Sequence, residues 1–173
     1  MILKQKVKLF VLPRRKLATI AQRMLAQFLK TVLRPLLLIF YIKKNATPAF
    51  AEYRTTNGYR VLCGKNNLQN EYITHKVAER SDFWFHVKNM PGSHVVMLLE
   101  GREEPPAEDF TEAASIAALF SAAEGAPMTE VDYTTVRNLK KAPGGAPGFV
   151  IYHTNWSAIV TPDKEKIASL RVK

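Results

Sequence analysis

Apolar residues gather in two short runs near the middle of the chain, Phe83 to Val87 and His94 to Leu99. Both runs are rich in β-branched and aromatic residues, and a turn centred on Pro91-Gly92 separates them. This pattern predicts two strands joined as a hairpin with a longer loop. The loop also carries more binding side chains than a plain turn needs, since Pro, Gly and a few polar residues would suffice.

Side chains alternate between the two faces of a strand, so the first run should present two different surfaces. One surface should join the core through two phenylalanines and a valine: Phe83, Phe85 and Val87. The other carries an aromatic ring, an imidazole and a cation in a row: Trp84, His86 and Lys88. A surface of that composition is suited to stacking on bases and to pairing with phosphates.

Further patterns place elements on both sides of this hairpin. A helix is expected over about residues 107–124, because Pro105-Pro106 precede it and Gly125 follows it. A short helix is expected within residues 66–78, and strands at about residues 59–63, 131–136, 149–153 and 158–161. We therefore predict an α+β domain with a mixed or mostly antiparallel sheet of about five strands and a helix packed on one face.

The beginning of the chain differs from the rest. We expect a basic, apolar, helical extension over residues 1–44, a linker over 45–57 and the domain over 58–173. The apolar run Leu36 to Ile42, followed by Ala49-Phe50-Ala51, also mimics a signal peptide. The basic region before that run is unusually long for a leader. No stretch approaches the ~20 apolar residues that cross a bilayer, so no membrane span is expected.

The positive charge is concentrated in this first part of the chain. The net charge is +10, but residues 1–51 hold eleven of the 25 Lys and Arg residues and no acidic residue. Residues 52–173 therefore carry 14 basic against 15 acidic side chains. Any RNA affinity of the domain must come from local patches rather than from its overall field. The candidates are Lys65, Lys88, Arg137 and the pair Lys140-Lys141.

Metal binding and nucleophilic catalysis gain little support from the motifs. His86 and His94 could converge across the hairpin with Asp82, but there is no HExxH, no CxxC and no second acidic partner at ligand spacing. Ser93 adjoins His94, and adjacent residues on a strand point to opposite faces, which argues against a catalytic dyad. The single cysteine, Cys63, excludes an internal disulfide and suits a buried position. We expect no metal, no cofactor and no enzymatic activity.

Two further motifs could contact RNA. The amide cluster Asn66, Asn67, Gln69 and Asn70 could read base edges or clamp a backbone, or it could satisfy its own turns. The loop from Lys140 to Gly148 joins two lysines to glycines that let backbone amides approach a phosphate, or it is a solvated connection between strands. No GxxxxGK[ST] motif is present, so the loop is not a nucleotide-binding P-loop.

Several motifs together carry a resemblance to a known family. They occur in this order: Gly64 to Glu71, Asp82 to Val96, Thr111 to Ser121, Val131 to Val136, Lys140 to Val150, and the tail near Val160-Thr161-Pro162. From about residue 50 to 165 the chain resembles the NFACT-R domain, the C-terminal RNA-binding module of the RqcH and fibronectin-binding protein A-like family of ribosome-associated quality-control factors. Lys65 stands where the family usually has Arg, and loses the bidentate fork of that side chain.

The resemblance implies a cytoplasmic, ribosome-associated module that binds RNA during the rescue of stalled translation. Its implied partners are tRNA, large-subunit rRNA and a ribosome with an obstructed nascent chain. The implied RNA-binding residues are Lys65, Asn66, Asn67, Gln69, Asn70, Asp82, Trp84, His86, Lys88, Gly92, Ser93, His94, Lys140 and Lys141. The alternatives are a surface-associated fibronectin-binding adhesin and, less favoured, a hydrolase or nuclease built on Asp82, His86 and His94.

The extension departs from the family pattern. In the family, the segment before NFACT-R is the end of a charged coiled coil that joins it to the N-terminal half. Residues 1–44 contain no acidic residue and no sustained heptad. A truncated or mis-started reading frame is one explanation, because family-like sequence begins only near Tyr41.

Overall fold

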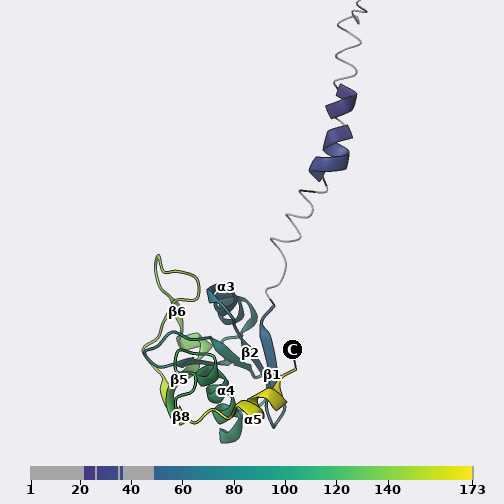
Figure 1. Cartoon of the computed structure of the whole chain (residues 1–173). Helices are drawn as coiled ribbons and strands as arrows, with labels where there is room; N and C mark the ends of the chain where they lie inside the picture. Colours follow the sequence, from purple (N-terminus) through teal and green to yellow (C-terminus); the bar gives the residue numbers. More distant parts are fainter. Residues whose placement is uncertain (1–21, 26, 35, 37–48, 173) are drawn as a thin grey trace, which may run out of the picture. The chain divides into compact units, whose positions relative to one another are not determined.

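The computed structural model describes residues 22–25, 27–34, 36 and 49–172 (Figure 1). The chain divides into two compact units, Met1–Thr47 and Pro48–Lys173. In the first unit, every described residue is helical, and these residues include the π-helix η1, Leu29–Leu33. This agrees with the helical extension predicted over residues 1–44, as far as that segment is described. The expectations for residues 1–21 and 37–48, including most of the apolar run, lie outside the described residues.

The second unit is built on an antiparallel sheet of six strands in the order β1-β2-β4-β3-β5-β8. Figure 1 shows β1 and β8 at its two edges. The predicted α+β class is confirmed. The strands are β1 (Ala51–Arg54), β2 (Arg60–Cys63), β3 (Phe83–Val87), β4 (Val95–Leu98), β5 (Thr129–Thr135) and β8 (Trp156–Val160). A separate two-stranded sheet pairs β6 (Lys140–Lys141) with β7 (Val150–Ile151).

Helix α4 (Ala107–Leu119) covers one face of the sheet. It begins after Pro105-Pro106 with Glu108 and Asp109 in its first turn, where acidic side chains favour the helix dipole. Its alanines are fully buried and let the helix approach the sheet closely, as the small residues of the sequence indicate: Ala113, Ala114, Ala117 and Ala118. Phe83 and Phe85 of β3 belong to this core, so the prediction for that face is confirmed.

The opposite face of the sheet is covered as well, and this forms a second core. Helix α3 (Asn67–Tyr72) runs into the π-helix η2 (Ile73–Val77), and Ile73 packs with Trp84 and Val96 on this face. Residues from β7 and the segments that flank β6 and β7 join them, among them Tyr152. The sheet is therefore buried on both sides, and β3 contributes to both cores.

The elements depart from the sequence expectations in three places. Strand β1 lies within the segment predicted to be a linker, and Ala51 and Tyr53 are buried in the first core. The predicted helix ends at Leu119 rather than near residue 124, because the following residues bind the β3–β4 turn: the N–H of Ser93 donates to the carbonyl of Phe120, at 2.9 Å. Helix α5 (Lys164–Leu170) was not expected.

Helix α5 is capped by the carboxylate of Asp163, which accepts hydrogen bonds from the N–H groups of Glu165 and Lys166. After this helix, Arg171 forms an isolated antiparallel β-bridge with Tyr53 of β1. No helix among the described residues is long and apolar enough to cross a membrane.

Candidate nucleic-acid interface

Two adjoining hollows flank the turn between β3 and β4. The first, which we call the aromatic hollow, has a volume of about 530 Å³ and is lined by Trp84, His86, His94, Phe149 and Tyr152 among others. The second, which we call the polar hollow, measures about 560 Å³, and its lining includes Lys65, Ser93, Ser121, Glu124 and Arg171. Four residues line both hollows and separate them: Asn67, Asn70, Pro91 and Gly92.

The floor of the aromatic hollow is a cluster of rings around Trp84. The indole stacks on the His86 imidazole, with centroids 5.6 Å apart and planes 8° from parallel, and it meets His94 edge-on at 5.1 Å. Tyr152 approaches from the other side at 5.2 Å. Trp84 is only 1% exposed, which corrects its assignment to an open stacking surface. The alternation along β3 is as predicted, but the face that carries Trp84 is a second core.

His94 is buried and held in place by three neighbours. Its Nδ1 lies 2.9 Å from the Thr74 hydroxyl, its backbone N–H donates to Asn70 Oδ1, and its carbonyl accepts from the N–H of Gly64. Burial, followed by the nearby His86 and His75, lowers the pKa of His94 to about 3, against the opposing effects of Glu71 and the Gly148 backbone. The imidazole is therefore neutral at pH 7.

His86 is half-buried beside Trp84. Burial lowers its pKa, and the backbone groups of Val87 and Gly92 and the carboxylate of Asp132 oppose that shift. Asp132 lies opposite His86 in the β3–β5 register and accepts hydrogen bonds from the hydroxyls of Tyr152 and Ser157. The two histidines of the hollow are thus uncharged at neutral pH, and they offer ring faces rather than positive charge.

The amide cluster is mainly architectural. Asn66 caps α3 by accepting from the N–H of Gln69, and the Gln69 side chain in turn bonds the backbone of Lys65 and Ala49. Asn70 is buried on His94, as described above. Asn67 alone of the four is both exposed and part of the lining of the two hollows. Asn66, Gln69 and Asn70 therefore satisfy the chain's own backbone and turns. Asn67 is the member of the cluster whose position allows contact with a ligand.

A close backbone approach fixes Asn70. A Cβ added at Gly64 would lie 2.2 Å from Asn70 Oδ1 and 2.9 Å from its backbone nitrogen. We therefore expect Gly64→Ala to lower the free energy of unfolding by about 1–3 kcal/mol, the usual cost of overpacking. Urea unfolding measures this change. In an Asn70→Ala background the same substitution should cost clearly less, and equal costs in both backgrounds would contradict the steric account.

Asp82 is a structural residue. It is 2% exposed, and its carboxylate accepts hydrogen bonds from the N–H groups of Glu79 and Leu99. These bonds tie the start of β3 to the segment after β4. Asp82 is therefore not available to RNA in this conformation, contrary to its place in the predicted set. Gly92 and Ser93 remain half-exposed at the turn.

The predicted lysines differ in their partners. Lys88 pairs with Glu130, and Lys141 pairs with Glu71. The carboxylate of Glu71 also accepts from the N–H of Gly148, and the Lys141 bond is the largest cause of its lowered pKa. Neither Lys65 nor Lys140, both exposed, forms an ion pair within the described part of the chain. Their charges are the ones left open to a phosphate.

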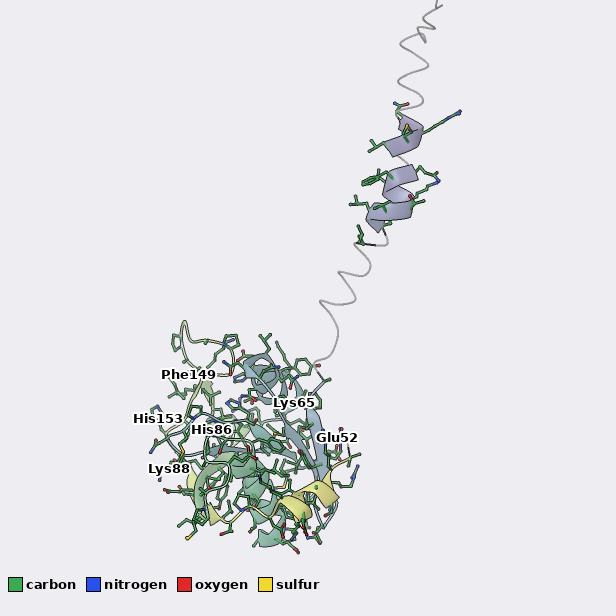
Figure 2. All side chains as sticks on the ribbon, viewed as in Figure 1. Glu52, Lys65, His86, Lys88, Phe149 and His153 are labelled. Carbon is green, nitrogen blue, oxygen red and sulfur yellow. The ribbon has the colours of Figure 1, made fainter. Side chains whose placement is uncertain are left out.

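The loop between β6 and β7 forms the outer wall of the aromatic hollow. Gly148 has a positive φ of +79°, and an added Cβ there would lie 3.0 Å from the carbonyl of Asn67. The loop thereby lies against α3, and it holds Phe149 at 60% exposure. Figure 2 shows Phe149 and His86 toward one side of the domain and Glu52 toward the other. Phe149 and Tyr152 were absent from the predicted set, because a strand assignment gave no reason to expect them beside Trp84.

Metal and nucleophile chemistry find no support among the described residues. No group of three or more His, Cys, Asp or Glu side chains there could hold a metal ion. Ser93 lines the polar hollow and His94 the aromatic hollow, so the two do not face a common space. Burial raises the pKa of the Cys63 thiol to about 11, and the thiol is protonated at pH 7.

Comparison with known proteins places this chain in a family of RNA-binding domains. The model of the NFACT protein RNA-binding domain matches residues 49–153, and the chain belongs to that family. The match includes every residue that lines the aromatic hollow. The resemblance noted in the sequence is thereby confirmed.

Individual relatives agree with the family. The chain is 44% identical over 129 residues to the Rqc2 homolog RqcH of Bacillus subtilis, and 42% identical over 121 residues to the RqcH of Streptococcus pneumoniae. These alignments cover 75% and 69% of the chain but 22% of either relative, so the chain spans about a fifth of their length. The solved C-terminal part of the fibronectin/fibrinogen-binding protein from Streptococcus suis is 40% identical, with a TM-score of 0.69 over 74% of this chain and 51% of that one.

Proposed function

We propose that this domain binds RNA in ribosome-associated quality control, in contact with tRNA, the large ribosomal subunit or both, while stalled translation is rescued in the cytoplasm. The observation that carries the proposal is the match to a family of RNA-binding domains over residues 49–153. The relatives named as RqcH support the ribosomal setting. Because the chain spans only a fifth of those relatives, the proposal concerns binding and not the activity of a whole factor.

The distribution of charge supports binding through local contacts. The domain carries nearly balanced charge, so a long-range field would contribute little to affinity. Lys65 lies beside the polar hollow, and Lys140 lies on β6, whose loop walls the aromatic hollow. Of the four predicted lysines, Lys88 and Lys141 each have a carboxylate partner, whereas Lys65 and Lys140 have none among the described residues. An RNA backbone would then gain most from these two positions.

Replacing Lys65 and Lys140 together by alanine should weaken RNA binding and make it less dependent on salt. Each lost phosphate contact reduces the slope of log K against log salt by about 0.7–0.9. Filter binding of tRNA to the whole chain across a salt series measures both quantities. Arg102→Ala is the matched control, since Arg102 lies over the Tyr59 ring at 3.7 Å and lines neither hollow.

The result tests whether RNA binds at the assigned surface of the domain or elsewhere in the chain. If the double variant and Arg102→Ala bind with the same slope as the unaltered chain, the affinity resides elsewhere, and the assignment of the interface is wrong. If no RNA binds even at low salt, while soluble fibronectin does, the adhesin alternative replaces the proposal. The relative from Streptococcus suis is named as a fibronectin/fibrinogen-binding protein, which is the reason for this comparison.

A further inference from the structure

We propose that the aromatic hollow accepts a single unpaired base of the bound RNA, with the Trp84 N–H as the donor to the edge of that base. This inference rests on the proposed RNA binding and specifies what one part of the surface recognises. It concerns the hollow between the β3–β4 turn, the start of α3 and the loop before β7.

The lining of the hollow favours a neutral, flat ligand. None of the described residues that line it is Lys, Arg, Asp or Glu. Its two histidines, His86 and His94, are uncharged at neutral pH because burial lowers both pKa values. A phosphate would find no cation there, whereas a base would find aromatic faces and the exposed amide of Asn67. Unpaired bases are recognised by such stacking and by hydrogen bonds to their edges.

The donor is an indole N–H that the chain itself leaves unused. Trp84 is 1% exposed, yet its Nε1 has no hydrogen-bond partner among the described residues. Buried polar groups are almost always paired, and indole can only donate. Ring nitrogens and carbonyl oxygens of bases are acceptors, so a base edge that reached Trp84 would satisfy this group. His94 is less suited to that role, since Thr74 lies at its Nδ1 and the backbone of Gly148 also hydrogen-bonds its ring.

The rim of the hollow supplies the stacking platform. Phe149 is 60% exposed and Met90 is 44% exposed, although both are large apolar side chains. Both line the hollow, Phe149 from the loop before β7 and Met90 from the β3–β4 turn. A base between them would cover apolar surface that is now in water. Lys65 lies in the adjoining polar hollow, beyond Asn67 and Gly92, where the next phosphate of the same strand would pass.

The chain offers a direct reporter for this site. It contains two tryptophans, Trp84 and Trp156, so Trp156→Phe leaves Trp84 as the sole emitter. We would titrate that variant with two RNA oligonucleotides of about ten nucleotides, within the usual site sizes. One carries bases, and the other is an abasic ribose-phosphate chain of equal charge. The base-bearing strand should change Trp84 emission and the abasic strand should not, even where the basic extension binds both.

Two substitutions then test the contacts. Phe149→Ala, made at an exposed position, should weaken binding of the base-bearing strand about ten-fold, as loss of one base–aromatic stack does, and leave the abasic strand unaffected. Trp156→Ala, at an aromatic residue that is 51% exposed and lines a different hollow, should change neither when binding is followed by filter retention. Trp84→Phe keeps an aromatic ring and removes the donor, and should also weaken binding of the base-bearing strand alone.

The outcomes separate this inference from the function on which it rests. Equal Trp84 responses to the two strands, or equal losses on both strands in Phe149→Ala, would overturn base capture while salt-dependent RNA binding stood. An unchanged affinity in Trp84→Phe with a full loss in Phe149→Ala would overturn the role of the N–H. Absence of any RNA binding would remove the proposed function together with this inference.

Discussion

Lowering the pH from about 6.5 to 4.5 should reduce the free energy of unfolding by about 2–3 kcal/mol, because His94 is buried as a neutral imidazole. Its pKa is about 3 in the folded chain, against an ordinary value of 6.5 for histidine. As the pH falls below 6.5, His94 becomes protonated in the unfolded chain but stays neutral in the folded chain. The stability is therefore complete above pH 6.5 and is lost as the pH falls toward 3.

The groups that face His94 set the useful window for this measurement. His86 from β3 and His75 from η2 act in the same direction as burial, while Glu71 from α3 opposes it. Glu71 has a lowered pKa of its own, so its contribution to the free energy of unfolding is also lost on acidification, but only below the ordinary glutamate pKa of 4.5. Between pH 6.5 and 4.5 the change in stability should come mainly from His94 and His86, and urea unfolding followed by circular dichroism at several pH values measures it.

A variant separates His94 from its neighbours. His94→Gln retains an acceptor for the Thr74 hydroxyl but cannot titrate in this range. It should be less stable than the unaltered chain at pH 7 and should show a much flatter profile down to pH 4.5. A slope that persists undiminished in His94→Gln would assign the effect to His86 instead, whose pKa is also lowered by burial.

Alternation along β3 could be predicted from the sequence, but the covering of its second face could not. The alternation of side chains along a strand tells which of them share a face. It does not tell which other element covers that face. Trp84 is buried because η2 packs over it and because Tyr152 reaches it from beyond β7. Both elements are short and irregular, and neither has an apolar pattern that points to a second layer. The same face was therefore assigned to solvent.

The net charge of the domain could be predicted from the sequence, but the lysines that remain unpaired could not. Composition alone showed that the domain is close to neutral. Which lysines remain unpaired depends on partners that are distant in the sequence: Glu130 lies 42 residues from Lys88, and Glu71 lies 70 residues from Lys141. These pairs arise only when β5 aligns with β3 and the β6–β7 hairpin meets α3. They turn four candidate lysines into two.

Replacing Trp84 by alanine should lower the free energy of unfolding by about 3–5 kcal/mol, as truncation of a large buried aromatic residue usually does. Trp84 is 1% exposed and contacts rings from β3, from His94 just before β4 and from the segment after β7, so its loss leaves a cavity in the second core. Phe85→Ala, on the opposite face at 0% exposure, should cost a similar amount. Urea midpoints of both variants measure the two cores separately.

His86→Ala is the control for this pair, because His86 is half-exposed and stacks on Trp84 from the edge of the hollow. It should cost roughly 1 kcal/mol, near the centre of values for single substitutions. If Trp84→Ala costs no more than His86→Ala, the second core does not hold the sheet and Trp84 belongs to an open surface after all. If Trp84→Ala instead destabilises the domain as much as Phe85→Ala does, the aromatic hollow is a recess in a closed core, and a base that enters it passes Phe149 and Asn67 at the rim to reach the Trp84 N–H.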